Sequence, residues 1–338
     1  MIYFDQAAAV RPAPELLDFY RETAARTFCN QEAAHAFAYR LRQELQEAGK
    51  RLALAVTGKP MHVCWGCSGT DVLQAAGRIF SSRKGGVQLS AMVHPAVEAA
   101  FAGCRAAEAP ALTVFPHVES ETGLISNAPE TPQDDCLTFC DAIQSAGKLF
   151  PLPDADFIAV SGNKLGGMGG GALLYKDEAY EKLFARLRTD HFLSRPEPAQ
   201  CLALAHAAGL AAEKKQENEL KVREITSFLR EKLTGTPLPG GGKVQPTLPE
   251  EKTSPYILHL LLPGIQTGVL VRMLGDMGAA CSAGSACAAE STEPSRILRA
   301  MDHARDAYSG LRLSFGADNT MDEAREFIKI FQQAVREY

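Results

Sequence analysis

Short apolar runs alternate with helical patterns along the first half of the chain. Helical segments at 71–81 and 96–107 separate the first three runs. Strands that alternate with helices are typical of crossover units, which build a mainly parallel sheet flanked by helices. The pattern therefore predicts an α/β fold here. The predicted strands are 61–65, 87–92, 112–116, 136–142 and 157–160.

The ends of the chain have a different pattern. A strand-like segment at 2–4 precedes helices at 16–25 and at about 32–56, the second ending before Gly58 and Pro60. A smaller α+β lobe is predicted to follow a charged amphipathic helix at 214–232, and its last helix opens with a capping box from Thr320 to Glu323. Its other predicted elements are a loop at 237–249, strands at 256–262 and 311–315, and helices at 266–277 and 293–301.

Composition narrows the class of protein. The chain has 338 residues, of which 46% are apolar and 22% charged, so it can bury a core and does not have the composition of a disordered chain. A formal charge of −5 lacks the basic excess of a dedicated nucleic-acid binder, and we expect no nucleic-acid partner. Small-molecule chemistry is the first hypothesis.

No apolar run approaches the roughly 20 residues that a membrane span needs. The first residues carry an acid where a signal peptide has bases. The nine cysteines are irregularly spaced, which indicates free thiols in a reducing compartment. We therefore expect a cytoplasmic protein without a membrane partner.

Lys164 lies in a glycine-rich loop directly after the predicted strand at 157–160. Ligands of parallel sheets bind outside the carboxyl ends of the strands, where this lysine would lie. A lysine amine forms a Schiff base with pyridoxal phosphate, and glycines let a ligand approach closely. Taken alone, a loop with a solvated lysine is the simpler interpretation. Other motifs have to decide between it and a cofactor-binding lysine.

Asp141 ends another apolar strand, where burial of an unpaired carboxylate is costly. The nitrogen of a pyridinium ring would pair with it, and keeping that nitrogen protonated makes the ring an electron sink. Gln144 follows three residues later and is placed to reach the oxygen of the ring. The alternatives are a helix N-cap for Asp141 and an exposed position for Gln144.

A strand-to-helix turn contains Gly69 and Thr70. Backbone N–H groups at the helix start and the Thr70 hydroxyl would form a phosphate cradle, although such turns also occur with nothing bound. Cys64 and Cys67 form a lone CxxC across this turn. Because no histidine cluster accompanies it, the pair does not favour zinc, and we expect no metal site. Thioredoxin-like chemistry is the less favoured alternative for the pair.

His94 and Cys287 are two further candidates. His94 opens a helix after an apolar run and is a candidate for contact with an aromatic ring, a structural role being the alternative. Cys287 lies in a stretch of small residues at 281–295, which predicts an exposed loop. An accessible thiolate there would be a nucleophile, and the alternative is a surface cysteine without a role.

The order of these motifs resembles that of the cysteine desulfurase family, which belongs to the class V aminotransferases of the type I pyridoxal-phosphate fold. The resemblance covers nearly the whole chain, and so many motifs in one order are hard to obtain by chance. In chain order they are Tyr3-Phe-Asp-Gln-Ala-Ala8, Asn30 with His35, Gly69-Thr-Asp71, His94-Pro-Ala-Val97, Glu121-Thr-Gly123, Asp141 with Gln144, Ser161 with Lys164, Gly284-Ser-Ala-Cys287, Glu293-Pro-Ser295 and Arg312-Leu-Ser-Phe-Gly316.

The resemblance implies an enzyme that moves sulfur from L-cysteine to Cys287 as a persulfide and releases L-alanine. Lys164 would hold pyridoxal 5'-phosphate and then act as acid and base on the substrate α-carbon, while His94 would stack on the ring and share proton transfer. Arg312 would bind the substrate carboxylate through its planar fork. The ring contacts would come from Asp141 and Gln144, and the phosphate contacts from Gly69, Thr70, Ser161 and Asn163.

The chain departs from the family at several positions. Asn163 stands where histidine is usual, and Glu119-Ser120 stands where the family has an Asn-Asn pair. The second asparagine helps to hold the substrate, so Ser120 is the expected substrate contact, and the acid beside it could weaken carboxylate binding or change the preferred substrate. An Arg-Gly-Thr segment that supplies a phosphate contact across the family's dimer has no match at 186–205, and the chain is shorter than typical members.

The resemblance further implies a homodimer and a protein sulfur acceptor. It places a large cofactor-binding domain at 13–212 and a small domain at 1–12 and 213–338, which carries the Cys287 loop. The alternatives are a class V aminotransferase or related lyase acting on another amino acid, including a selenocysteine lyase, and a degenerate non-catalytic scaffold in sulfur trafficking.

Overall fold

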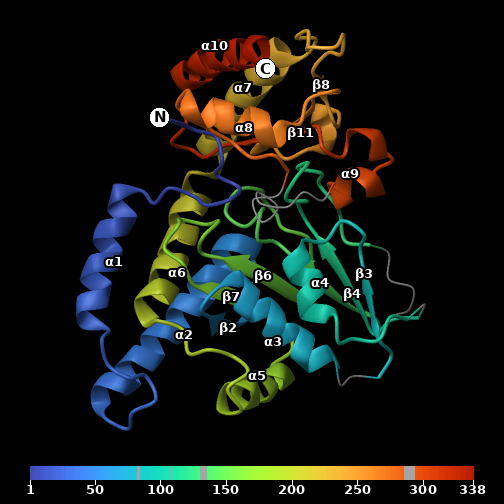
Figure 1. The fold of residues 1–338 in the computed structure, drawn as a ribbon. Helices are drawn as coiled ribbons and strands as arrows, with labels where there is room; N and C mark the ends of the chain where they lie inside the picture. Colours follow the sequence, from blue (N-terminus) through green and yellow to red (C-terminus); the bar gives the residue numbers. More distant parts are fainter. Residues whose placement is uncertain (82–83, 108, 130–134, 285–293) are drawn as a thin grey trace. The chain divides into compact units, whose positions relative to one another are not determined.

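The computed structural model describes residues 1–81, 84–107, 109–129, 135–284 and 294–338 (Figure 1). They group into a larger unit, Val10–His117 with Ser126–Lys215, and a smaller unit, Met1–Ala9 with Val118–Ile125 and Gln216–Tyr338. The domain boundaries expected from the sequence stay a prediction. The grouping differs from them in placing Val118–Ile125 with the smaller unit.

A sheet forms the centre of the larger unit. Among the described residues it has six strands in the order β2-β7-β6-β5-β4-β3. The strands β3 to β6 pair in parallel, and β7 is antiparallel to both β6 and β2. The predicted mainly parallel sheet is confirmed. The strands are β2 (His62–Gly66), β3 (Val87–Leu89), β4 (Leu112–Pro116), β5 (Leu137–Asp141), β6 (Phe157–Ser161) and β7 (Gly171–Tyr175).

Helices flank both faces of this sheet (Figure 1). None of the described helices has both the length and the apolar character needed to cross a membrane. One face is covered by α1 (Pro14–Arg26), α2 (Ala36–Thr57) and α6 (Pro198–Glu213), and the other by α3 (Gly69–Ser81), α4 (Pro95–Phe101) and α5 (Ala179–Thr189).

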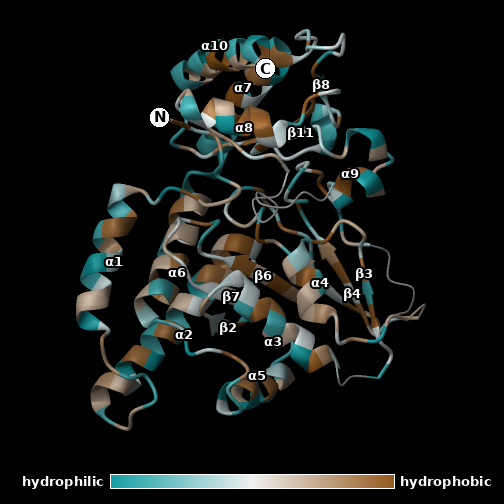
Figure 2. Ribbon diagram, viewed as in Figure 1, coloured by the Kyte–Doolittle hydropathy of each residue, from teal (hydrophilic) through white to brown (hydrophobic). Residues whose placement is uncertain are grey.

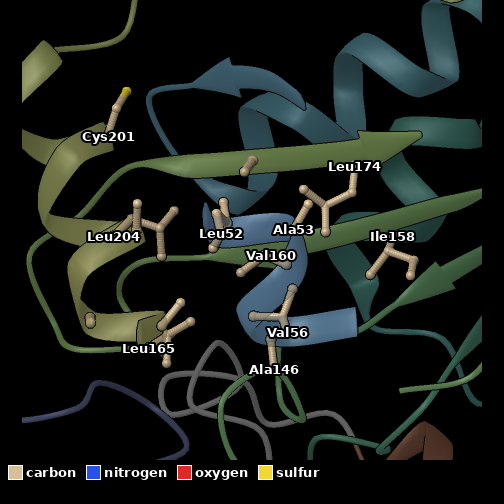
Figure 3. Packing of buried hydrophobic residues seen from close by; sticks show 14 of the residues in the cluster. Leu52, Ala53, Val56, Ala146, Ile158, Val160, Leu165, Leu174, Cys201 and Leu204 are labelled. Carbon is tan, nitrogen blue, oxygen red and sulfur yellow. The ribbon is translucent and has the colours of Figure 1, made fainter. Parts of the chain in front are cut away.

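The central strand β6 contributes to the cores on both faces. Successive side chains of a strand point to opposite faces, so Ile158 and Val160 join one core while Phe157 and Ala159 join the other. Figure 3 shows Val160 in the first core with Leu52 of α2. A strand buried on both faces has no polar alternation, which is why it reads as an unbroken apolar run.

The smaller unit contains two small sheets and amphipathic helices. Its described strands form an antiparallel sheet, β11-β9-β8, and a parallel pair, β1-β10. Figure 2 shows hydrophobic and hydrophilic colours alternating along α10. The elements are β1 (Ile2–Tyr3), β8 (Gln245–Pro246), β9 (Ile257–Leu261), β10 (Ala279–Ala280), β11 (Gly310–Ser314), α7 (Lys215–Leu233), α8 (Thr267–Asp276), α9 (Arg296–Ala300) and α10 (Met321–Glu337), with 3-10 turns at Glu250–Lys252 and Ala304–Asp306.

The predicted capping box of α10 is confirmed. The Thr320 hydroxyl accepts a hydrogen bond from the Glu323 N–H at 3.2 Å, and the Glu323 carboxylate accepts one from the Thr320 N–H at 2.8 Å. The two side chains thus satisfy backbone donors reciprocally, which fixes where α10 begins.

Several element boundaries differ from prediction for local reasons. The helix α2 begins at Ala36 and not near residue 32, because the His35 ring accepts from the Ala38 N–H and caps it. The helix predicted at 96–107 ends at Phe101. The helix α6 was not predicted, since it buries residues around its circumference and shows no apolar stripe.

The packing of α3 against α4 depends on Gly77. A Cβ atom added at Gly77 would lie 1.9 Å from the carbonyl oxygen of Ala100, a backbone atom that cannot rotate away. We expect Gly77→Ala to lower the free energy of unfolding by about 2 kcal/mol or more. A Cβ at Gly209 in α6 would meet nothing within 4 Å. Gly209→Ala is the matched control and should raise stability by about 0.5–1 kcal/mol. Denaturant midpoints check both, and equal midpoints would contradict the packing argument.

Candidate active site

The carboxyl edge of the larger sheet gathers several predicted site residues. Asp141 ends β5 and Ser161 ends β6, and these neighbouring strands run in parallel. Gly171, at the start of β7, pairs with both Ser161 and Gly66, so the end of β2 lies at the same edge. Polar residues from separate stretches of the chain therefore meet at one edge, as the ligand crevices of such sheets require.

The first turn of α3 is held against this edge by glycines. A Cβ at Gly69 would lie 2.9 Å from Ser161 Cβ, and one at Gly171 would lie 2.2 Å from the Ser68 carbonyl oxygen. The turn is also capped from within, because Ser68 Oγ accepts from the Asp71 N–H and Asp71 Oδ2 accepts from the Cys67 N–H. The positive end of a thirteen-residue helix thus lies beside Ser161, with Thr70 exposed on it.

Asp141 is buried and lacks a described counter-charge. Its Oδ1 accepts from the Ile143 N–H at 3.0 Å, so it caps the following turn. Burial raises the pKa of Asp141 to about 6, the backbone hydrogen bond lowers it, and no described cation contributes. Gln144, also buried, lies in the same turn. This carboxyl would be stabilised as an anion by a cationic N–H partner from outside the chain.

Lys164 follows β6 in a tight glycine-rich turn. Its N–H donates to the Ser161 carbonyl at 3.1 Å, and the Gly167 N–H donates to the Gly162 carbonyl at 2.7 Å. The Lys164 side chain is half-buried, while Asn163 is exposed and its carbonyl accepts from the Val10 N–H. Because the turn follows β6 directly, Lys164 lies close to Ser161 in the sequence and thus near the sheet edge that Asp141 and Ser161 share.

His94 caps α4. Its Nδ1 accepts from the Ala96 N–H at 3.1 Å, so in the neutral ring the proton is on Nε2. The residue follows the outer strand β3, two strands from β5 in the sheet order. Its stacking on a cofactor ring stays a prediction.

In the smaller unit, Arg312 and Ser120 come together. Arg312 lies in β11 with a buried side chain, and its Nη1 donates to the Ser120 carbonyl oxygen at 2.8 Å. Its Nη2 donates to Asp5 Oδ1 at 2.9 Å and to Ser282 Oγ at 3.2 Å. Ser120 therefore meets the arginine through its backbone. Asp5 and Ser282 were not assigned a role from the sequence, although Asp5 lies in the first of the family motifs.

Glu119, where the family has asparagine, serves its own turn. Its carboxylate accepts from the N–H groups of Glu121 and Thr122 at 2.8 and 2.6 Å and from the Thr122 hydroxyl at 2.7 Å. The residue is 1% exposed. These bonds give the acid a structural role in the turn, and whether it changes substrate preference stays a prediction.

Glu121 is a buried acid that lies in a family motif but was not assigned a role from the sequence. Its Oε1 lies 3.8 Å from His259 Nε2, and Ser295 is hydrogen bonded to it. Burial, with a smaller contribution from Glu119, raises the pKa of Glu121 to about 7. Burial lowers the pKa of His259 to about 3, so that ring is neutral. A Cβ at Gly284 would lie 3.3 Å from Glu121 Oε1. The sequence signals were the motif Glu121-Thr-Gly123 and a histidine, His259, inside an apolar strand. Cys287 and Glu293 lie outside the described residues.

The turn that Glu119 caps should depend on its carboxylate. Glu119→Ala leaves four donors without their acceptor and should lower the free energy of unfolding by about 2–3 kcal/mol. Glu119→Gln keeps one acceptor oxygen and should lose less. Chemical denaturation measures both, and an alanine variant as stable as the glutamine variant would contradict this role.

The raised pKa of Glu121 predicts a pH dependence of stability. Because the folded state holds this proton more tightly, its stabilisation is complete below the ordinary pKa of 4.5 and is lost as the pH rises through about 7. Relative to Glu121→Gln, which stays neutral, the protein should lose about 3 kcal/mol between about pH 4.5 and about pH 8. Glu326→Gln on α10 changes an exposed acid and should give a flat difference. A flat difference for Glu121→Gln would contradict the prediction.

Comparisons with known proteins agree on a family. The model of the family described as Aminotransferase class-V matches residues 104–327. The cysteine desulfurase IscS of Anaeromyxobacter sp. (strain Fw109-5) is 26% identical over 384 residues, which cover 99% of this chain and 92% of that protein. The IscS-like cysteine desulfurase of Mycobacterium tuberculosis (strain ATCC 25618 / H37Rv) is 30% identical over 207 residues, 58% of this chain and 51% of that relative. That match spans about half of the relative's length.

A solved structure described as a NifS-like protein has a TM-score of 0.81 at 18% identity, with 100% of both chains covered. This likeness confirms the predicted fold. The match of the family model spans more than half of the chain, and the chain therefore belongs to the class V aminotransferase family.

Proposed function

We propose that this protein is a pyridoxal-phosphate-dependent cysteine desulfurase, which takes sulfur from L-cysteine onto Cys287 and releases L-alanine. The observation that carries the proposal is the buried carboxyl of Asp141, without a described counter-charge, at the same sheet edge as Ser161, Lys164 and the start of α3. Relatives with the name cysteine desulfurase support the choice of reaction.

The residues at this edge fit the cofactor by their chemistry. The carboxyl of Asp141 would pair with the ring nitrogen, and the dipole of α3 would favour a phosphate beside Gly69. When bound, pyridoxal phosphate would supply an electron sink for charge on the substrate α-carbon. The remaining contacts would come from Gln144 and His94 at the ring and from Thr70, Ser161 and Asn163 at the phosphate.

The chain's own groups would then handle protons, charge and sulfur. The Lys164 amine would move a proton at the substrate α-carbon, and Arg312 would bind the substrate carboxylate. The Cys287 thiolate would attack the substrate sulfur. An S–S bond forms as the Cβ–S bond breaks, and the electron pair left on Cβ takes up a proton, which yields alanine and a persulfide.

The proposal includes a homodimer, a protein acceptor for the sulfur and a cytoplasmic location. All eight cysteines among the described residues are free thiols, which suits a reducing compartment. A second candidate is a class V lyase or aminotransferase acting on another amino acid. It is favoured by the absence of the family's Asn-Asn pair at Glu119-Ser120.

The deciding experiment incubates the protein, reconstituted with pyridoxal phosphate, with L-cysteine and measures alanine and the Cys287 persulfide together. We expect both products. Lys164→Ala should lower turnover on the order of 10³-fold, while Lys176→Ala, an exposed lysine of the same unit, should not. Cys287→Ala should abolish the persulfide, with Cys67→Ala, an exposed thiol, as its control.

Three results would contradict the proposal. Alanine formation that survives Lys164→Ala would exclude the lysine mechanism. Products from another amino acid in the absence of alanine from cysteine would favour the second candidate. Failure of borohydride to attach the cofactor covalently to Lys164 would favour the scaffold alternative.

A further inference from the structure

The arginine that is expected to bind the substrate already forms an ion pair with a carboxylate of the chain itself. The Arg312 side chain is 1% exposed, and its Nη2 lies 2.9 Å from Oδ1 of Asp5, whose side chain is 19% exposed. A guanidinium stays charged at all ordinary pH values, so its burial requires a nearby anion. Asp5 provides that anion from within the smaller unit.

Three segments of the smaller unit hold this pair in place. The backbones of Arg312 and Ser282 exchange hydrogen bonds at 2.8 and 3.2 Å. The backbone of Asp5 forms a parallel β-bridge with that of Ser314. Ser282 Oγ donates to Asp5 Oδ1 at 2.7 Å and accepts from Arg312 Nη2 at 3.2 Å. The hydroxyl therefore fixes the aspartate against the guanidinium.

The guanidinium nevertheless keeps unused donor capacity. A guanidinium has five N–H donors, and three contacts engage them here, to Ser120, Asp5 and Ser282. The Nε atom is buried and has no hydrogen-bond partner among the described residues. A buried donor without a partner is costly, and a carboxylate with two acceptor oxygens would satisfy it.

We infer that Asp5 competes with a ligand carboxylate for Arg312 and thereby sets the affinity of Arg312 for that ligand. The inference rests on the proposed function for the identity of the ligand, an α-amino carboxylate. Asp5 neutralises the guanidinium before any ligand arrives, so a second carboxylate meets a smaller net attraction and repulsion from Asp5.

The test compares Asp5→Asn with the unaltered protein, using acetate as the probe. Asparagine keeps an acceptor oxygen but removes the negative charge, so acetate should bind about tenfold more tightly or better. Thermal midpoints at constant ionic strength report acetate binding, and acetamide is the neutral control. The KM for L-cysteine should fall by a similar factor without a matching fall in kcat. Asp322→Asn removes an exposed charge from the same unit and should change neither quantity.

Loss of a buried counter-charge can prevent folding, so a second variant accompanies the first. Ser282→Ala keeps the ion pair and removes the hydroxyl that fixes Asp5, so it should shift acetate affinity in the same direction by a smaller factor. Adding Arg312→Gln to either variant should abolish the response. If Asp5→Asn does not fold, an unchanged acetate affinity in Ser282→Ala overturns the inference.

The two proposals fail in different ways. Acetate binding needs neither cofactor nor turnover. A gain in acetate affinity in Asp5→Asn, together with no desulfurase activity in the unaltered protein, therefore supports the inference and refutes the proposed function. Desulfurase activity with unchanged acetate affinity and KM in a folded Asp5→Asn refutes the inference alone.

Discussion

Close approach of backbone to backbone at the carboxyl edge of the larger sheet is the constraint on which the candidate site depends. A side chain at Gly171 would collide with the Ser68 carbonyl, and one at Gly162 would collide with the Gly169 carbonyl. Neither obstacle is a flexible side chain that can turn aside. The start of α3, the end of β6 and the lysine turn can therefore lie together only because these positions carry no Cβ.

The two units handle polarity in different ways. At the edge of the larger sheet, Asp141 is buried with a single described hydrogen-bond donor. Its carboxyl lacks a described counter-charge, which a bound cationic group would supply. In the smaller unit, two acids are already engaged, the buried Glu119 by its own turn and the partly buried Asp5 by Arg312. A cofactor would gain from the first arrangement, while a substrate would have to compete with the second.

Local pattern predicted much of the fold and one part of the site. Strand β6 was predictable because burial on both faces leaves an unbroken apolar run, and Asp141 because an acid ending such a run must find a partner. The pairing of Asp5 with Arg312 was not predictable, since the two residues are 307 positions apart and neither sequence neighbourhood encodes the other. The turn at Glu119 was not predictable for another reason. Its hydrogen bonds are local, but an acid beside a serine is not a distinctive sequence pattern.

The pairing of β1 with β10 has a consequence for the order of events during synthesis. Ile2 and Tyr3 are synthesised before the larger unit, whereas their partners Ala279 and Ala280 are synthesised after it. The larger unit is complete at Lys215 and can close while translation continues. The smaller unit has to wait until Ala280 has been made, so β1 has no partner strand in the nascent chain until then, and an unpaired strand is open to pairing with other chains.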